Sequence, residues 1–200
     1  IPGGVKNNFA QQCADVPELA VLVHGLSHKN LAPLGEKKSE FGPCRPVKEM
    51  LEDAATALEI LKARFPDSTY PVFVPPWIRI DPELASCLPK ANLLGLSRFG
   101  PRMAINRIKG LNECNCHVDL IDWRGKRNFV GQELALDALI SHLCARRTGA
   151  VDAGEATGIL SHHNVMDDNS WQFLEELFCR TKESEGAHWL NMNQIFNLNI

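Results

Sequence analysis

Residues 22–30 read Leu-Val-His-Gly-Leu-Ser-His-Lys-Asn, and here a short apolar run, residues 19–23, gives way to polar side chains. The apolar run predicts a buried strand, and Gly25 allows the chain to turn directly after it. After such a turn, the imidazoles of His24 and His28 can meet one ion. The alternative interpretation is a pair of polar residues in a surface loop. The position at a strand end favours a site, because α/β proteins usually build their sites there.

Outside this stretch, apolar runs and helical patterns alternate along the chain. Further strands are predicted at residues 70–74, 93–97, 113–119 and 157–161, with a short final strand at 189–190. Helices are predicted at 45–65, from Asp81 onwards, at 131–147 and at 171–182. This alternation predicts an α/β fold with a parallel sheet, open or closed, in a single domain that spans residues 1–200.

The composition limits the classes of partner. Apolar residues make up 44% of the chain and charged residues 22%, which is ordinary for a globular protein. The net charge of −3 gives no basic surface for nucleic acid, and no apolar run has the length of a membrane span. The seven cysteines are scattered, which predicts reduced thiols in a cytoplasmic protein. We therefore expect neither a nucleic-acid nor a membrane partner.

Polar and aromatic side chains follow four of the predicted strands. In chain order they are His24 and His28, then Trp77 and Arg79, then Asp119, Asp122 and Trp123, and finally His162. The carboxyl ends of parallel strands share one face of a sheet, so these side chains are expected to converge on one pocket. For Trp77, packing in the core is an equally weighted alternative.

Together these clusters resemble the motifs of the polysaccharide deacetylases, carbohydrate esterase family four. His24 and His28 are similar to the family's metal-binding pair, and Pro75-Pro76-Trp77 resembles its proline–aromatic loop. Residues 119–123, Asp-Leu-Ile-Asp-Trp, match its D-x-x-D-W motif, and residues 160–162, Leu-Ser-His, match its L-x-H motif. The resemblance implies a distorted (β/α) barrel and a metal-dependent hydrolase that removes acetyl groups from an N- or O-acetylated carbohydrate.

The resemblance also assigns roles to individual residues. His24 and His28 would bind a divalent metal, most simply zinc. His162 would be the acid that protonates the departing amine, with Asp122 holding its tautomer. The substrate-binding residues would be Pro76, Trp77, Arg79, Trp123 and Leu160. His163 is the alternative to His162 for the role of the acid. Neighbouring residues of a strand face opposite ways, so only one of the two is expected to enter the pocket, and the family motif selects His162.

Other polar residues are expected to be structural. Asp167 and Asp168 are predicted to cap a helix. His117, His142 and His188 carry no motif and are expected to be ordinary histidines.

Two elements of the family pattern are not matched. The family's aspartate pair supplies the general base and a third metal ligand, but Asp15 is the only aspartate before His24. We expect this pair and its strand either upstream of Ile1 or absent, which leaves the barrel incomplete at its N-terminal end. The 200-residue chain alone is then expected to be nearly inactive, and its unpaired sheet edge favours homo-oligomers. Val74 stands where the family has an arginine, and Arg79 is the candidate to supply that charge.

Two other functions are compatible with the sequence. The chain could be a non-catalytic relative of the deacetylases that binds a carbohydrate or a protein partner. It could also be an amidohydrolase that acts on a small nitrogen compound.

Overall fold

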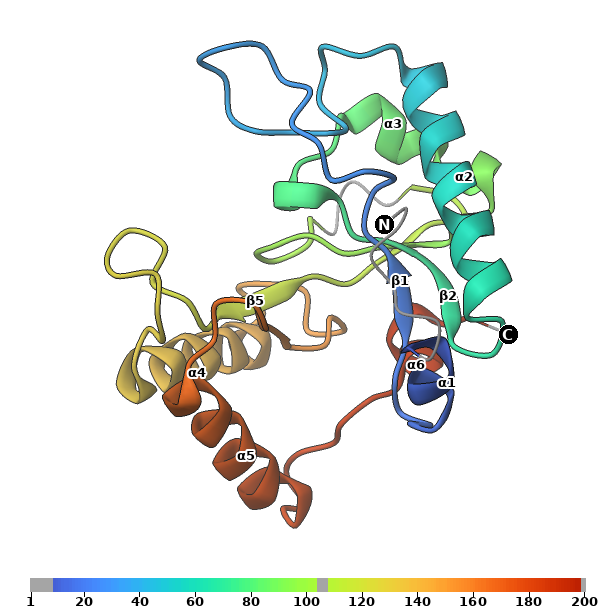
Figure 1. Cartoon of the computed structure of the whole chain (residues 1–200). Coiled ribbons are helices and arrows are strands. Elements are labelled where there is room, and N and C mark those ends of the chain that lie inside the picture. The colour runs from blue at the N-terminus through green and yellow to red at the C-terminus, as the bar shows by residue number, and fades with distance from the viewer. Residues whose placement is uncertain (1–8, 104–107, 199–200) are drawn as a thin grey trace. The chain divides into compact units, whose positions relative to one another are not determined.

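The computed structural model describes residues 9–103 and 108–198 and divides into two compact units (Figure 1). Of the described residues, unit 1 holds 9–98, 108–114 and 192–198. Unit 2 holds 99–103 and 115–191. Each unit contains helices and a parallel sheet, so the predicted α/β class with parallel strands is confirmed.

Unit 1 holds a four-stranded parallel sheet whose strands are neighbours in chain order. The strands are β1 (Val21–Val23), β2 (Thr69–Phe73), β3 (Gly95–Leu96) and β4 (Asn112–Glu113). The register pairs Val23 with Phe73 and Val72 with Gly95. Gly95 is required there, because a Cβ would lie 2.6 Å from the Val72 Cγ2 atom.

The helical elements of unit 1 are α2 (Val47–Arg64), the 3₁₀ turns η1 (Pro76–Ile78) and η2 (Leu88–Ala91), and α3 (Pro82–Cys87), while α1 (Phe9–Ala14) and α6 (Met192–Phe196) lie near the two ends of the chain. Two of them, α2 and α3, lie where the sequence predicts helices, and the structure adds short helical elements that were not predicted. Asp81 caps α3 by accepting hydrogen bonds from the Glu83 and Leu84 N–H groups.

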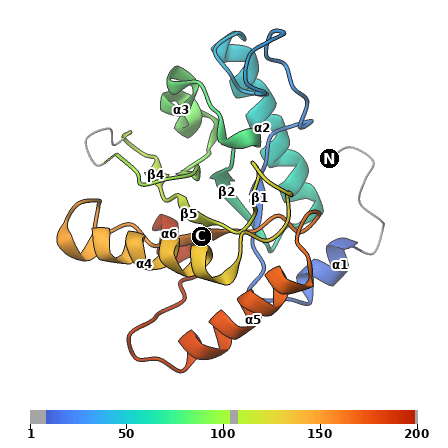
Figure 2. The ribbon, with the colours of Figure 1, turned by 90° about the vertical axis from the view of Figure 1, so that its left-hand side faces the viewer.

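The core of unit 1 lies between α2 and the sheet. Figures 1 and 2 both show α2 running along β1 and β2. Met50, Ala54 and Leu58 of α2 are fully buried, and they pack in one apolar cluster with Val23 and Phe73. This packing fixes the carboxyl ends of β1 and β2, from which the two loops with His24 and Trp77 begin.

Unit 2 pairs β5 (Cys116–Asp119) with β6 (Gly158–Leu160) in parallel. Its helices are α4 (Gln132–Thr148) and α5 (Asp168–Lys182). The core joins Val118 and Leu120 to Ala135 of α4 and to Phe173, Leu174 and Leu177 of α5. Asp167 caps α5, as predicted, by accepting hydrogen bonds from the N–H and hydroxyl groups of Ser170.

The structure corrects the sequence predictions at two places. The strand predicted at 113–119 is two strands, β4 and β5, which belong to different sheets. The strand predicted at 189–190 is wrong, because these residues lie outside any strand and Trp189 packs its ring on Phe178 of α5. The described strands form the two parallel sheets above, with no closed barrel among them.

Among residues 9–103 and 108–198, no helix combines the length and the apolar character that crossing a membrane requires.

Candidate functional site

His24 and His28 lie on a tight turn that follows β1. Gly25 has a φ of +74° and His28 a φ of +53°, both in the left-handed region. A Cβ on Gly25 would lie 2.5 Å from a Glu40 carboxylate oxygen and 2.7 Å from Pro76 Cγ. Only glycine therefore fits this turn, which brings the two imidazole ring centroids to 5.0 Å from each other.

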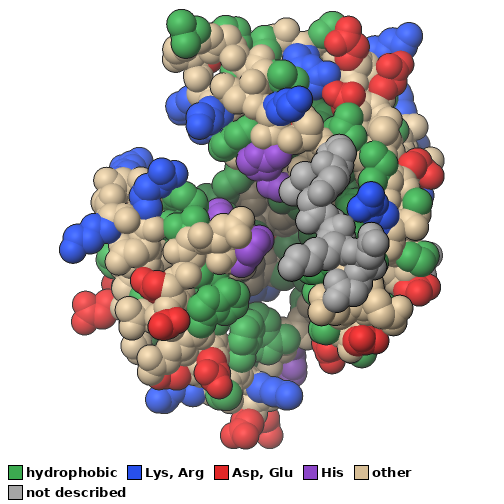
Figure 3. All heavy atoms as spheres, viewed as in Figure 1, with side chains coloured by type: hydrophobic (Ala, Val, Ile, Leu, Met, Phe, Trp, Pro, Cys, Tyr) green, Lys and Arg blue, Asp and Glu red, His purple; other side chains and the backbone are tan. Residues whose placement is uncertain are grey.

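The hydrogen bond of His24 fixes its tautomer. Its Nδ1 atom lies 2.8 Å from the Val74 carbonyl oxygen, at the carboxyl end of β2. A carbonyl oxygen can only accept, so Nδ1 carries the proton and Nε2 carries the lone pair in the neutral ring. Histidines that bind metals usually show this arrangement, in which the second ring nitrogen donates to a carbonyl or carboxylate. Both histidines are exposed, and histidine side chains reach the surface on the face drawn in Figure 3.

The loop after β2 brings Trp77 to the same turn. The Trp77 and His28 rings lie 4.4 Å apart between centroids, and Trp77 is half-buried. Trp77 and Ile78 have φ values of +54° and +63°. Positive φ is rare for such bulky residues, and backbone strain of this kind gathers at functional sites. The first two clusters predicted from the sequence are thus neighbours within unit 1.

Arg79 is hydrogen-bonded to the loop between β1 and α2. Its guanidinium donates to the Lys38 carbonyl oxygen at 2.8 Å. Beside it lies a cavity of about 320 Å³ whose lining includes Ala32, Ser39 and Ile80. Arg79 therefore holds the loop at residues 32–43 next to the Trp77 segment.

In unit 2, Asp119 and His162 lie at the ends of the paired strands. The His162 Nε2 atom is 3.3 Å from Asp119 Oδ1, and the second Asp119 oxygen accepts a hydrogen bond from the Trp123 indole at 2.8 Å. The Trp123 ring meets His162 edge-on, with centroids 4.7 Å apart. Leu160 pairs with Asp119 in the register of β5 and β6, and His163 is exposed.

The role that the sequence analysis gave to Asp122 needs correction. The Asp122 carboxylate accepts hydrogen bonds from the Arg124 and Gly125 N–H groups and so shapes its own turn. Asp119 is the last residue of β5, and its register with Leu160 puts it level with the segment that carries His162. The carboxylate beside His162 is therefore Asp119. The convergence of His24 and His28 with His162 on one pocket stays a prediction.

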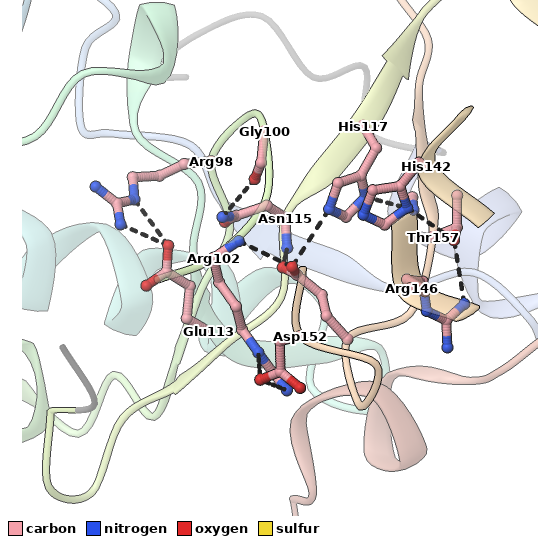
Figure 4. A network of polar contacts seen from close by, with 12 residues as sticks. Arg98, Gly100, Arg102, Glu113, Asn115, His117, His142, Arg146, Asp152 and Thr157 are labelled. Carbon is pink, nitrogen blue, oxygen red and sulfur yellow. Dashed lines mark hydrogen bonds and ion pairs between the residues drawn. The ribbon is translucent and has the colours of Figure 1, made fainter. Parts of the chain in front are cut away.

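A third polar cluster, which the sequence analysis missed, is buried in unit 2 (Figure 4). Glu155 is fully buried, accepts hydrogen bonds from the Arg102 and Asn115 N–H groups, and lies 3.4 Å from His117 Nε2. The His117 and His142 rings stack with centroids 3.5 Å apart. The possible ligand atoms of His117, His142 and Glu155 lie within 4.8 Å of one another, so this group could hold a metal ion.

The hydrogen bonds in this cluster indicate that the His117 nitrogen facing Glu155 carries a proton and is not free to bind a metal. His117 Nδ1 accepts from the Gly158 N–H at 3.1 Å, so its Nε2 carries the proton and faces Glu155. Burial lowers the pKa of His142, and the neighbouring His117 lowers it further. Burial alone would raise the pKa of Glu155, but hydrogen bonds from His117, Arg102 and Asn115 outweigh it and leave this pKa below its usual value. The cluster therefore pairs a neutral His142 with an ionised Glu155.

We predict that Gly25→Ala disrupts the turn after β1. The change adds a left-handed strain of about 1–2 kcal/mol and a collision with Pro76 and Glu40 that costs about 1–3 kcal/mol more. Gly35 is the matched control, since its φ is +89° and nothing lies within 4 Å of an added Cβ. Urea unfolding should show that Gly25→Ala is the more destabilising change. Equal losses in the two variants would contradict the crowding at Gly25.

Comparison of the chain with protein-family models, with curated proteins and with solved structures gave no match.

Proposed function

We propose that the protein is a metal-dependent hydrolase that removes acetyl groups from N-acetylated, or O-acetylated, carbohydrates. The observation that carries the proposal is the 2.8 Å hydrogen bond between His24 Nδ1 and the Val74 carbonyl oxygen. This bond leaves the lone pair of His24 on Nε2, in a turn that also carries His28. The proposal extends to the fold, a (β/α) barrel of the polysaccharide deacetylase type.

The strand order supports the barrel. In a (β/α) barrel each parallel strand lies beside the next one in the chain, whereas a doubly wound sheet reverses its order at a switch point. The order β1-β2-β3-β4 follows the chain without reversal, and β5 pairs with β6 in the same way.

The donor set of the turn fits a divalent metal. Neutral imidazoles are preferred zinc ligands, and catalytic zinc sites usually use three protein ligands, so His24 and His28 would need one more. In the deacetylase pattern that ligand comes from an aspartate pair. A metal held here would polarise the acetamide carbonyl and lower the pKa of a bound water. Both histidines are exposed, which gives a substrate access to them.

His162 is suited to protonate the departing amine. Its Nε2 faces Asp119, so the proton on Nδ1 is the one that the ring would give to the amine nitrogen as the C–N bond breaks. The Trp123 indole N–H and the Ile121 backbone N–H hold the Asp119 carboxylate in place. Pro76, Trp77, Trp123 and Leu160 are the candidates for contacts with the substrate.

Two groups in the structure could hold the metal, and their tautomers favour the turn after β1. His24 already has its lone pair on Nε2, whereas His117 would first have to lose its Nε2 proton. The His117 and His142 rings are also nearly parallel, at 20°, so their in-plane lone pairs do not point at a common centre.

Zinc titration of the chain tests the proposal. The variant His24→Ala/His28→Ala should lose zinc affinity by more than about tenfold, because both ligands are removed. His163→Ala is the control, since His163 is exposed and is not one of the proposed metal ligands. Equal zinc affinity of the wild type and the double variant would contradict the assignment of His24 and His28 as ligands. A loss of zinc affinity in His142→Ala alone would place the metal in unit 2. Release of acetate from acetylated amino-sugar oligomers tests the reaction itself.

A further inference from the structure

Glu40 is a buried carboxylate, and among the described residues its side chain accepts hydrogen bonds only from residues 24–28, which we call the histidine turn. Its exposed fraction is 1%. One oxygen accepts from the N–H groups of Leu26 at 3.2 Å and Ser27 at 2.9 Å, and also from the Ser27 hydroxyl at 3.1 Å. The other oxygen accepts from the His28 N–H at 2.9 Å. Three consecutive backbone donors therefore converge on one side chain.

Glu40 is itself anchored to α2. The Arg45 guanidinium donates to the Glu40 carbonyl oxygen at 3.1 Å and to the Asp53 carboxylate, on α2, at 2.7 Å. The next residue, Phe41, is fully buried and pairs with Ile80. The position of the carboxylate is thus set by the core of unit 1 and not by the exposed loop that precedes it.

The Glu40 carboxylate holds His28 in a backbone conformation that the residue would otherwise rarely adopt. His28 has a φ of +53°, and its N–H group is one of the four donors to Glu40. Residues held in such sparsely populated regions persist only where their surroundings fix them. The same carboxylate fills the space beside Gly25, where a Cβ would collide with it.

We propose that Glu40 is the positioning residue of the metal site, an inference that rests on the proposed role of His24 and His28. Glu40 acts through the backbone of residues 26–28 and sets the distance between the two imidazole rings. Metal affinity depends on this preorganisation. Mutation of a residue that holds the metal ligands in place typically lowers the affinity about 10- to 100-fold.

The variant Glu40→Gln tests the inference. The amide has nearly the same size, but its NH₂ group replaces an acceptor and faces the N–H groups of the turn. We expect the zinc affinity to fall about 10- to 100-fold. We also expect faster hydrogen exchange at the Leu26, Ser27 and His28 amides. Glu113→Gln is the matched control: it removes a largely buried carboxylate of the same unit that pairs with Arg98, and both readouts should stay at wild-type values.

The outcomes separate this inference from the proposed function. Unchanged exchange in Glu40→Gln, or unchanged zinc affinity despite faster exchange, overturns the positioning role. Wild-type protein that binds no zinc defeats the proposed function instead, and amide exchange then decides alone whether Glu40 holds the turn. If Glu40→Gln does not fold, Glu40→Asp takes its place, since it keeps both acceptor oxygens. Aspartate is expected to give a smaller loss of zinc affinity, and wild-type values in it would also count against the inference.

Discussion

If the proposed function holds, replacing His162 by alanine is expected to lower kcat for acetamide hydrolysis by about 10²–10⁴-fold with little change in KM. The reason is that a general acid acts in the transition state, when the C–N bond breaks, and contributes little to binding of the ground state. The measurement is the release of acetate from acetylated amino-sugar oligomers with metal supplied. It is made on the 200-residue chain and on a form extended upstream of Ile1, because the proposed deacetylase pattern takes its general base from an aspartate pair that residues 1–23 do not contain.

Matched variants of the two aspartates locate the partner of His162. Asp119→Asn changes the carboxylate that lies 3.3 Å from His162 Nε2 and orients the ring, so it should also lower kcat. Among residues 9–103 and 108–198, the Asp122 carboxylate accepts hydrogen bonds only from its own turn, so Asp122→Asn should leave kcat close to the wild-type value. A full rate in His162→Ala would remove His162 from the reaction. A larger loss in Asp122→Asn than in Asp119→Asn would restore the role first predicted for Asp122.

Local patterns in the sequence predict much of the fold. The helix predicted at 45–65 is α2 (Val47–Arg64), because apolar spacing sets its buried face and Pro66 prevents its continuation. Asp81 and Asp167 cap helices as predicted, since capping depends only on the next three residues. The division of residues 113–119 between two sheets depends on which strands pair, and the local pattern holds no information on that pairing.

In the candidate site, too, the features set by local sequence could be predicted, and those set by strand pairing or tertiary structure could not. The turn with His24 and His28 can be found from its glycine and its place after a strand. Glu40 lies beyond a polar loop, and nothing in its neighbourhood distinguishes it from an exposed glutamate. The choice between Asp119 and Asp122 follows from the register of β5 with β6. His117, His142 and Glu155 come from a strand, a helix and a loop, so only the tertiary structure brings them together.

The second large effect is expected at the buried cluster of unit 2. Glu155→Gln should lower the free energy of unfolding by about 2–4 kcal/mol, because a buried network loses its charge and one of its acceptors. The Arg102 and Asn115 N–H groups and the His117 ring all depend on this carboxylate. Urea unfolding followed by tryptophan fluorescence measures the loss, since Trp123, Trp171 and Trp189 all belong to unit 2. Wild-type stability in Glu155→Gln would show that water replaces these contacts without cost.

The same cluster predicts how stability depends on pH. The pKa of His142 is lowered from 6.5 in the folded protein, mainly by burial, so both states are neutral above pH 6.5. Below pH 6.5 the unfolded chain binds the proton more readily than the folded one, and the free energy of unfolding falls. The pKa of Glu155 is lowered from 4.5, since its hydrogen bonds outweigh burial, so its contribution is present above pH 4.5 and is lost below it. His142→Gln, which no longer titrates, should flatten the upper part of this decline and keep the lower part. His163→Gln, a change at an exposed histidine, should leave the whole curve unchanged, and an equal flattening in both variants would show that His142 is not its source.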